Sequence, residues 1–141
     1  MVSALDTVTV AAFENGGAWL DELREYISDN RRLVKEYISE HIPKLSMIDG
    51  AATYLLWIDA RKVTCGVKKS SDPHSSIDNE GSVENLAAFI REKTGLYLSD
   101  GEEYGAPGFL RMNVACPSSY VEDGLRRLAK GIELWEEYHD L

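Results

Sequence analysis

The chain has 141 residues, of which 44% are hydrophobic and 28% charged, a composition typical of one globular domain rather than of a disordered or fibrous protein. Its formal net charge of -9 argues against a general affinity for nucleic acids or anionic membranes, because both depend on clustered Lys and Arg. We expect neither a targeting signal nor a membrane span, because no apolar stretch is long enough and Asp6 interrupts the N-terminal one.

The N-terminal third is predicted to be helical. A short helix from Leu5 to Phe13 should end at the turn of residues 15–17, which holds two glycines. A long amphipathic helix is predicted from Trp19 to His41, because apolar residues recur there at spacings of three, four and seven, and Pro43 ends it. These apolar residues are Leu20, Leu23, Ile27, Val34, Tyr37, Ile38 and Ile42.

Two strands and a long loop follow. Residues 45–49 and 53–59 are separated by a short turn, which favours an antiparallel hairpin. The second strand is almost wholly apolar and should lie inside the sheet. From Arg61 to Ser82 the pattern gives way to Ser, Asp, Pro, Asn and Gly, which indicates an exposed loop with a short helix at its start.

The last third adds a helix, two strands and a final helix. We expect Ser82 to cap a helix that Gly95 closes, followed by strands at residues 96–99 and 109–117 and a helix capped by Ser118 or Ser119. This order predicts an α+β fold: a two-layer sandwich in which helices cover one face of a small, mostly antiparallel or mixed sheet, preceded by the long amphipathic helix.

The strand at residues 109–117 carries the main functional candidate. Alternate residues of a strand point to opposite faces, so Arg111 and Asn113 share a face with small or apolar neighbours, and the other face is purely apolar. A guanidinium on a rigid strand could bind a carboxylate through two parallel hydrogen bonds. The alternative is a solvated arginine on an outer face. Gly105 and Gly108 flank a turn where the backbone could approach a ligand, which does not decide between the two.

Other candidates have less support. Tyr54 is expected to be a core aromatic whose hydroxyl finds one partner, and it is a secondary candidate for substrate binding. The histidines have no metal-binding spacing, the adjacent Glu102 and Glu103 suggest a charged turn, and Lys68 and Lys69 lie in a polar stretch unsuited to a reactive amine. The histidines are His41, His74 and His139. No nucleophile, general base or metal site is apparent.

Cysteine usage points to a reducing compartment. Cys65 and Cys116 are the only cysteines, and they show neither CxxC spacing nor a disulfide pattern. We therefore expect free thiols in a cytoplasmic protein, with Cys116 buried and inert.

Three segments together resemble a known family. The stretches "AAFENGGAWLDELREYISDNRRLV", "ATYLLWIDAR" and "YGAPGFLRMNVACP", in this order and followed by an amphipathic helix, resemble the C-terminal part of fold-type I pyridoxal-phosphate enzymes. Within these class I/II aminotransferases, the likeness is strongest to the cystathionine β-lyase branch of carbon-sulfur lyases. It covers nearly the whole chain apart from the loop at residues 63–82.

The resemblance implies a role for Arg111. In that family the arginine of this strand binds the α-carboxylate of an L-amino-acid substrate, which orients the Cα-H bond relative to the ring of pyridoxal 5'-phosphate. The lysine that binds the cofactor, and the other cofactor ligands, lie upstream in a large domain and have no counterpart here. The resemblance thus implies no catalytic or cofactor-binding residue in this chain.

The resemblance also implies a domain division and partners. Residues 1–15 would be a helical remnant of the preceding large domain, and residues 16–141 the aminotransferase-like small domain, which in the parent meets the large domain and the second subunit of a homodimer. The chain alone should be inactive, whereas its parent would catalyse β-elimination or transamination. The alternative is an autonomous module that binds an amino acid or another carboxylate without the cofactor.

Overall fold

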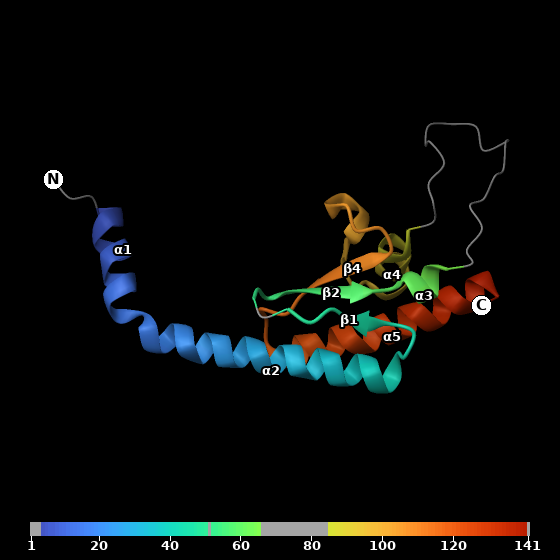
Figure 1. Cartoon of the computed structure of the whole chain (residues 1–141), viewed down its shortest axis with the longest axis horizontal. Coiled ribbons are helices and arrows are strands. Elements are labelled where there is room, and N and C mark those ends of the chain that lie inside the picture. The colour runs from blue at the N-terminus through green and yellow to red at the C-terminus, as the bar shows by residue number, and fades with distance from the viewer. Residues whose placement is uncertain (1–3, 51, 66–84, 141) are drawn as a thin grey trace.

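The computed structural model describes residues 4–50, 52–65 and 85–140. Two helices come first, α1 (Ala4–Asn15) and α2 (Gly17–His41), which confirms the two predicted helices. Gly16 separates them and is sterically required, because a Cβ at this position would collide with the carbonyl oxygen of Ala12. Helix α1 turns away from the axis of α2 and extends from the rest of the molecule (Figure 1).

The sheet has four antiparallel strands in the order β1-β2-β4-β3. Its strands are β1 (Ser46–Met47), β2 (Leu55–Asp59), β3 (Ser99–Asp100) and β4 (Phe109–Asn113). The hairpin of β1 and β2 and the interior position of β2 were both predicted and are confirmed. The edge strands are shorter than predicted, so the two central strands carry most of the pairing.

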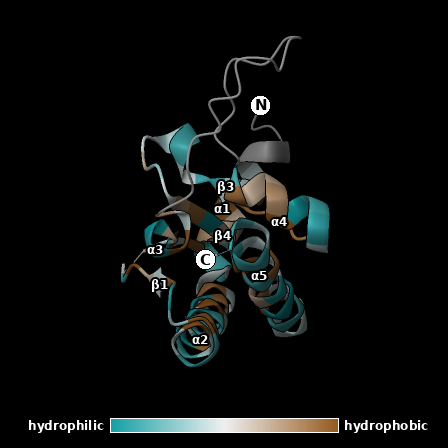
Figure 2. Cartoon of the chain, turned by 90° about the vertical axis from the view of Figure 1, so that its right-hand side faces the viewer, coloured by the Kyte–Doolittle hydropathy of each residue, from teal (hydrophilic) through white to brown (hydrophobic). Residues whose placement is uncertain are grey.

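Helices cover one face of this sheet, as the α+β prediction requires. Helices α2 and α5 (Ser118–His139) contact each other and run beneath the sheet, and α4 (Leu86–Thr94) packs on α5 (Figures 1 and 2). The buried core lies between these two layers. Its largest fully buried apolar side chains come from every layer and are Val34, Ile38, Ile58, Val63, Ile90, Val114, Val121, Leu125, Leu128 and Trp135.

One buried polar side chain ties the two layers together. Asn30 of α2 is 2% exposed, and its Nδ2 donates hydrogen bonds of 2.9 Å to the carbonyl oxygens of Val114 and Cys116. A buried side-chain amide is costly unless it is hydrogen-bonded. Here the carbonyl oxygens of the segment that follows β4 accept both of its donor hydrogen bonds. Asn30 therefore fixes the position of β4 relative to α2.

Two predicted helix caps are wrong. Asn85 caps α4, because its Oδ1 accepts a hydrogen bond of 3.1 Å from the amide of Ala88, and Ser82 lies outside the described residues. Ser118 is already the first residue of α5, and its amide donates to the hydroxyl of Tyr26 at 2.8 Å. In the second case a tertiary contact replaces the local cap. Gly95 closes α4 in the left-handed conformation, as predicted.

The predicted long loop is described only at its start. A short helix, α3 (Arg61–Thr64), begins there, which confirms that part of the prediction. The remainder, including His74 and the two adjacent lysines Lys68 and Lys69, falls outside the described residues.

Candidate functional site

Strand β4 holds Arg111 in the middle of the sheet. The strand is paired on both sides, with Trp57 of β2 and Ser99 of β3 directly opposite Arg111. Burial alternates along β4: Leu110 and Met112 are buried in the core, and Arg111 is half-buried on the other face. Residues directly opposite each other in an antiparallel ladder point to the same face, so Arg111, Trp57 and Ser99 share the face that the helices leave uncovered.

Two hydroxyl groups hold one nitrogen of the Arg111 guanidinium. Its Nη2 donates to the hydroxyl of Tyr104 at 2.6 Å and to the Oγ of Ser99 at 3.4 Å. The guanidinium carbon also lies 3.9 Å from the centre of the Tyr104 ring. A cation this close to an aromatic face is attracted by the electron density of the ring. Tyr104 thus contacts Arg111 both through its ring and through its hydroxyl.

Aromatic side chains surround this contact. The Trp57 ring meets the Tyr104 ring edge to face, with centroids 5.9 Å apart, and meets the Phe109 ring in the same way at 6.4 Å. Such arrangements are favourable because the positive edge of one ring faces the negative face of the other. The guanidinium of Arg111 therefore sits on a partly apolar surface, where its electrostatic interactions are stronger than in open water.

A tight turn delivers Tyr104 to the face of the sheet. Tyr104 ends the 3-10 helix η1 (Gly101–Tyr104), whose first turn is capped by Asp100, the Oδ1 of which accepts from the amide of Glu102 at 3.0 Å. Gly105 closes the turn at φ 74°, a conformation that favours glycine. A Cβ on Gly101 would collide with backbone atoms of the following turn. The sequence "DGEEYG" therefore encodes the turn that places Tyr104 over Arg111.

The charge of Arg111 has no carboxylate partner among the side chains of residues 7–50, 52–65 and 85–140. None of the ion pairs in these ranges includes Arg111. Two other arginines in these ranges, Arg31 and Arg91, also form no ion pair. Arg31 donates to backbone carbonyl oxygens, and the exposed Arg91 lies over the Tyr97 ring. No hydrogen bond in the described part of the chain engages Nε or Nη1 of Arg111. Arg111 is thus a half-buried cation with donors available to an anion.

The carboxylate on the same face of β2 is already bound. Asp59 accepts from Nε and Nη2 of Arg61 at 2.9 and 2.7 Å, and from the Arg61 amide at 3.0 Å. These hydrogen bonds hold the pKa of Asp59 below its ordinary range, against the raising effect of its burial. Arg61 also lies over the Phe109 ring, with 4.9 Å from its guanidinium carbon to the centroid. Asp59 is therefore committed to Arg61 and leaves Arg111 unneutralised.

The two secondary candidates lie apart from this contact. Asn113 shares the face of Arg111, as predicted, but it is exposed and its Oδ1 accepts from the amide of Ala115 at 2.8 Å. Tyr54 was expected in the core and in a strand; it is 45% exposed, because Thr53 adopts φ 76° and β2 begins only at Leu55. No hydrogen bond or ring contact between described residues joins Tyr54 to Arg111.

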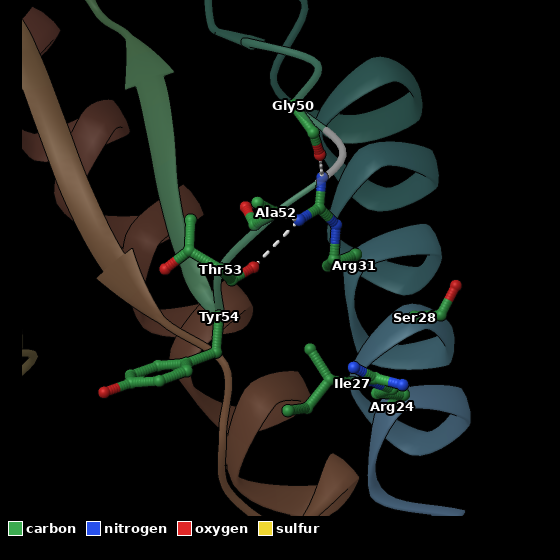
Figure 3. Close-up of a pocket in the computed structure, with 8 residues that line it drawn as sticks. All are labelled: Arg24, Ile27, Ser28, Arg31, Gly50, Ala52, Thr53 and Tyr54. Carbon is green, nitrogen blue, oxygen red and sulfur yellow. Dashed lines mark hydrogen bonds between the residues drawn. The ribbon is translucent and has the colours of Figure 1, made fainter. Parts of the chain in front are cut away.

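Tyr54 instead lines a surface pocket of about 690 Å³ between α2 and the segment before β2 (Figure 3). Arg31 spans this pocket and donates to the carbonyl oxygens of Gly50, Ala52 and Thr53, while the Tyr54 ring points away from it (Figure 3). Through these hydrogen bonds Arg31 holds the segment before β2 against α2. We assign the pocket no ligand.

Lysines and histidines give no second site among the residues described. All described lysines are exposed; they are Lys35, Lys44, Lys62, Lys93 and Lys130. No group of three His, Cys, Asp or Glu side chains there could hold a metal ion. Glu102 and Glu103 lie exposed in η1, as expected of a charged turn.

Both cysteines lie within the described residues, and Cys116 is less buried than the sequence suggested. Cys65 is exposed and Cys116 half-buried, and both are free thiols. Burial raises the pKa of the Cys116 thiol, which lowers the fraction present as the reactive thiolate. None of the helices in the described ranges is both long enough and apolar enough to span a membrane.

Comparison with known proteins identifies the family. Residues 2–128 match the model of the family described as aminotransferase class I and II. The chain belongs to this family. Relatives include the cystathionine β-lyase PatB of Bacillus subtilis, 32% identical over 124 residues, and the protein MalY of Escherichia coli, 30% identical over 128 residues. These alignments cover 86% and 89% of this chain but only 28% and 29% of the relatives.

Solved structures of the family share this fold. A PLP-bound putative aminotransferase from Clostridium difficile matches with a TM-score of 0.69 at 30% identity, covering 86% of this chain and 28% of that one. A putative PLP-dependent β-cystathionase from Corynebacterium diphtheriae matches with a TM-score of 0.68 at 26% identity, covering 87% and 29%. The resemblance to this family and to its cystathionine β-lyase branch is therefore confirmed. The chain spans under a third of these proteins' length.

Proposed function

We propose that this chain is the small domain of a pyridoxal-phosphate-dependent enzyme and that Arg111 binds the α-carboxylate of its L-amino-acid substrate. The observation that carries the proposal is the guanidinium of Arg111 on the open sheet face, half-buried against the Tyr104 ring and without a carboxylate partner in the described residues. A half-buried cation attracts an anion more strongly than a fully solvated one does, because less water screens the contact. A substrate carboxylate would supply that anion.

The shape of the guanidinium suits this ligand. Its planar fork donates two parallel hydrogen bonds to a planar carboxylate, which fixes the orientation of the ligand as well as its position. Strand β4 gives the fork a rigid base, because the strand is paired on both sides and tied to α2 through Asn30. A substrate anchored in this way would present its Cα-H bond in one direction, as proton removal at Cα requires.

The remaining chemistry belongs to other residues of a longer protein. Pyridoxal phosphate, when bound, supplies the electron sink for reactions at Cα. Its lysine needs a sheltered environment to be reactive, and each described lysine of this chain is exposed. We therefore propose that residues 1–15 continue a preceding large domain, that residues 16–141 form the small domain, and that the cofactor is held by the large domain of a homodimer.

The chemistry of the parent would be β-elimination from a sulfur amino acid or transamination of an amino acid. The names of the relatives, cystathionine β-lyases and aminotransferases, support these two reactions. The free thiols support a cytoplasmic location. On this proposal the isolated chain has no catalytic activity of its own.

The proposal is tested by titrating the chain with sodium acetate at constant ionic strength and following backbone amide signals of β4 by NMR. Acetamide serves as the neutral ligand of the same shape. We expect acetate but not acetamide to shift these signals, and Arg111→Lys to weaken acetate binding at least about tenfold, because a bidentate charge-assisted contact becomes a single point contact.

Arg91→Lys is the matched control, because Arg91 also lies over a tyrosine ring and forms no ion pair in the described ranges, but it is exposed. This variant should bind acetate as the unaltered chain does. Equal binding of acetate and acetamide, or unchanged binding in Arg111→Lys, would contradict the proposal.

A further inference from the structure

We propose that Tyr104 is the positioning residue for Arg111: its ring and hydroxyl hold the guanidinium in the orientation that receives the carboxylate. This inference rests on the proposed function and assigns a role within the same site. It starts from the contact of Tyr104 with Arg111 through both ring and hydroxyl, 3.9 Å from the guanidinium carbon to the ring centre and 2.6 Å from Nη2 to the hydroxyl oxygen.

The ring leaves the charge of Arg111 intact. A cation-π contact attracts the guanidinium but does not neutralise it, unlike a contact with Asp or Glu. A neutral aromatic partner can therefore hold an arginine still without competing for its charge. On the same face of the sheet, the carboxylate of Asp59 is engaged by Arg61 through two side-chain hydrogen bonds.

The donor hydrogens show what a carboxylate must displace. A guanidinium has one hydrogen on Nε and two on each Nη, and a bidentate carboxylate takes one hydrogen from Nη2 and one from Nε or Nη1. In the free chain Nη2 already donates to two hydroxyl oxygens, those of Tyr104 and Ser99. One of the two contacts must therefore open when a carboxylate binds. The contact to Ser99, at 3.4 Å, is the longer and weaker, so we infer that Ser99 is released and Tyr104 stays.

Tyr104 is itself fixed well enough to position another side chain. Tyr104 is 48% exposed, but its ring packs edge to face with Trp57, and the turn of η1 is constrained by Gly101 and Gly105, where a side chain would clash or be strained. A long arginine side chain otherwise loses much rotational freedom when it binds a ligand. Restricting it beforehand lowers that entropy loss and so strengthens binding.

The experiment compares Tyr104→Phe, Tyr104→Leu and Ser99→Ala in the same acetate titration, together with hydrogen exchange of the Nη2 hydrogens of Arg111 in the free chain. We expect Tyr104→Phe to weaken acetate binding about threefold to tenfold, as loss of one hydrogen bond does. Tyr104→Leu, which also removes the ring, should weaken binding further, and both variants should speed exchange of the Nη2 hydrogens, because the bond to the Tyr104 hydroxyl is lost. Ser99→Ala should leave acetate binding unchanged or slightly tighter.

Tyr97→Phe is the matched control, because the Tyr97 ring lies against Arg91 and no hydrogen bond between described residues joins its hydroxyl to Arg111. This variant should leave both readouts unchanged. Unchanged exchange and binding in Tyr104→Phe and Tyr104→Leu, or tighter binding in either, would overturn the inference; tighter binding would mean that Tyr104 masks Arg111.

The exchange measurement needs no ligand, which separates this inference from the proposed function. If acetate shifts no signal in the unaltered chain, the carboxylate role of Arg111 fails, and the inference that depends on it is overturned with it. If acetate binds and Arg111→Lys abolishes binding but the Tyr104 variants behave as the unaltered chain does, the positioning role alone is overturned.

Discussion

Arg111 and Asp59 lie on one face of the sheet but have different partners. Arg61, two residues after Asp59 in the chain, donates hydrogen bonds to both of its carboxylate oxygens. Arg111 is held by neutral groups, Tyr104 and Ser99. Asp59 is thus paired locally with Arg61, whereas Arg111 has neutral side-chain partners, which suits Arg111 to bind an anion.

The Asp59–Arg61 pair should make stability depend on pH. Because hydrogen bonds from Arg61 lower the pKa of Asp59 in the folded state, the pair's contribution is fully present above the unfolded pKa, about 4 for an aspartate, and is lost as pH falls through the folded pKa. Asp59→Asn should lower stability at pH 7 and reduce the further loss on acidification below about pH 4. Urea unfolding at pH 7 and at pH 3 measures both effects.

Asp49→Asn is the control for this prediction. Asp49 is bonded to Lys35, which also lowers its pKa, but the Asp49 side chain is 73% exposed and solvent screens the pair. This variant should change stability little at either pH. If the acid dependence of Asp59→Asn equals that of the unaltered chain, the pair does not contribute as described.

At the scale of elements, two glycines on α5 differ in the space that surrounds them. A Cβ at Gly131 would lie 2.9 Å from Cγ1 and 3.2 Å from Cγ2 of Ile90, which is wholly buried in α4. A Cβ at Gly124 would lie 3.4 Å from the flexible end of Met112 and 3.6 Å from Leu96, close to ordinary van der Waals contact. The absence of a side chain at Gly131 therefore allows α4 and α5 to approach each other.

Alanine substitution at the two glycines should give opposite results. Gly131→Ala should lower the free energy of unfolding by about 1–3 kcal/mol, because the helices must separate or Ile90 must move within a packed core. Gly124→Ala should leave it unchanged or raise it by up to about 1 kcal/mol, since alanine favours helix. Chemical unfolding followed by circular dichroism measures both. A stabilising effect of Gly131→Ala would show that the α4–α5 packing is looser than described.

At the scale of the whole molecule, an apolar surface extends from α1 into the start of α2 and lacks a covering element in the described chain. Its exposed side chains include Phe13, 88% exposed, and Trp19, 66% exposed, with Val8, Val10 and Leu20. Helix α1 and the first part of α2 extend beyond the body of the molecule (Figure 1). Exposed apolar surface of this kind is typical of an interface with another domain or subunit.

The isolated chain should therefore self-associate as its concentration rises. Phe13→Ser combined with Val8→Ser should reduce the association without changing the free energy of unfolding, because these side chains make no core contacts. Sedimentation velocity across a wide concentration range, with Tyr120→Ser as a control for loss of an exposed aromatic on α5, measures this. A monomer at every concentration that still binds acetate would favour the alternative of an autonomous binding module.

Local patterns in the sequence were enough to predict much of this protein. Apolar periodicity and turn residues predicted the helices, the β1–β2 hairpin and the interior position of β2, because these depend on spacing along the chain. Strand alternation placed Arg111 and Asn113 on the face opposite Leu110 and Met112. The three family segments predicted the family itself, which the comparisons confirm.

Only the tertiary structure decided which parts of these elements are buried and what surrounds Arg111. The apolar stripe of α2 predicted burial along the whole helix, but Leu20 is 41% exposed and the buried positions begin at Asn30, because the sheet and α5 cover only its later turns. Tyr104, seven residues before Arg111, reaches it through the fold of η1 over the sheet. Contacts across strands and turns depend on three-dimensional geometry, which spacing in one chain does not specify.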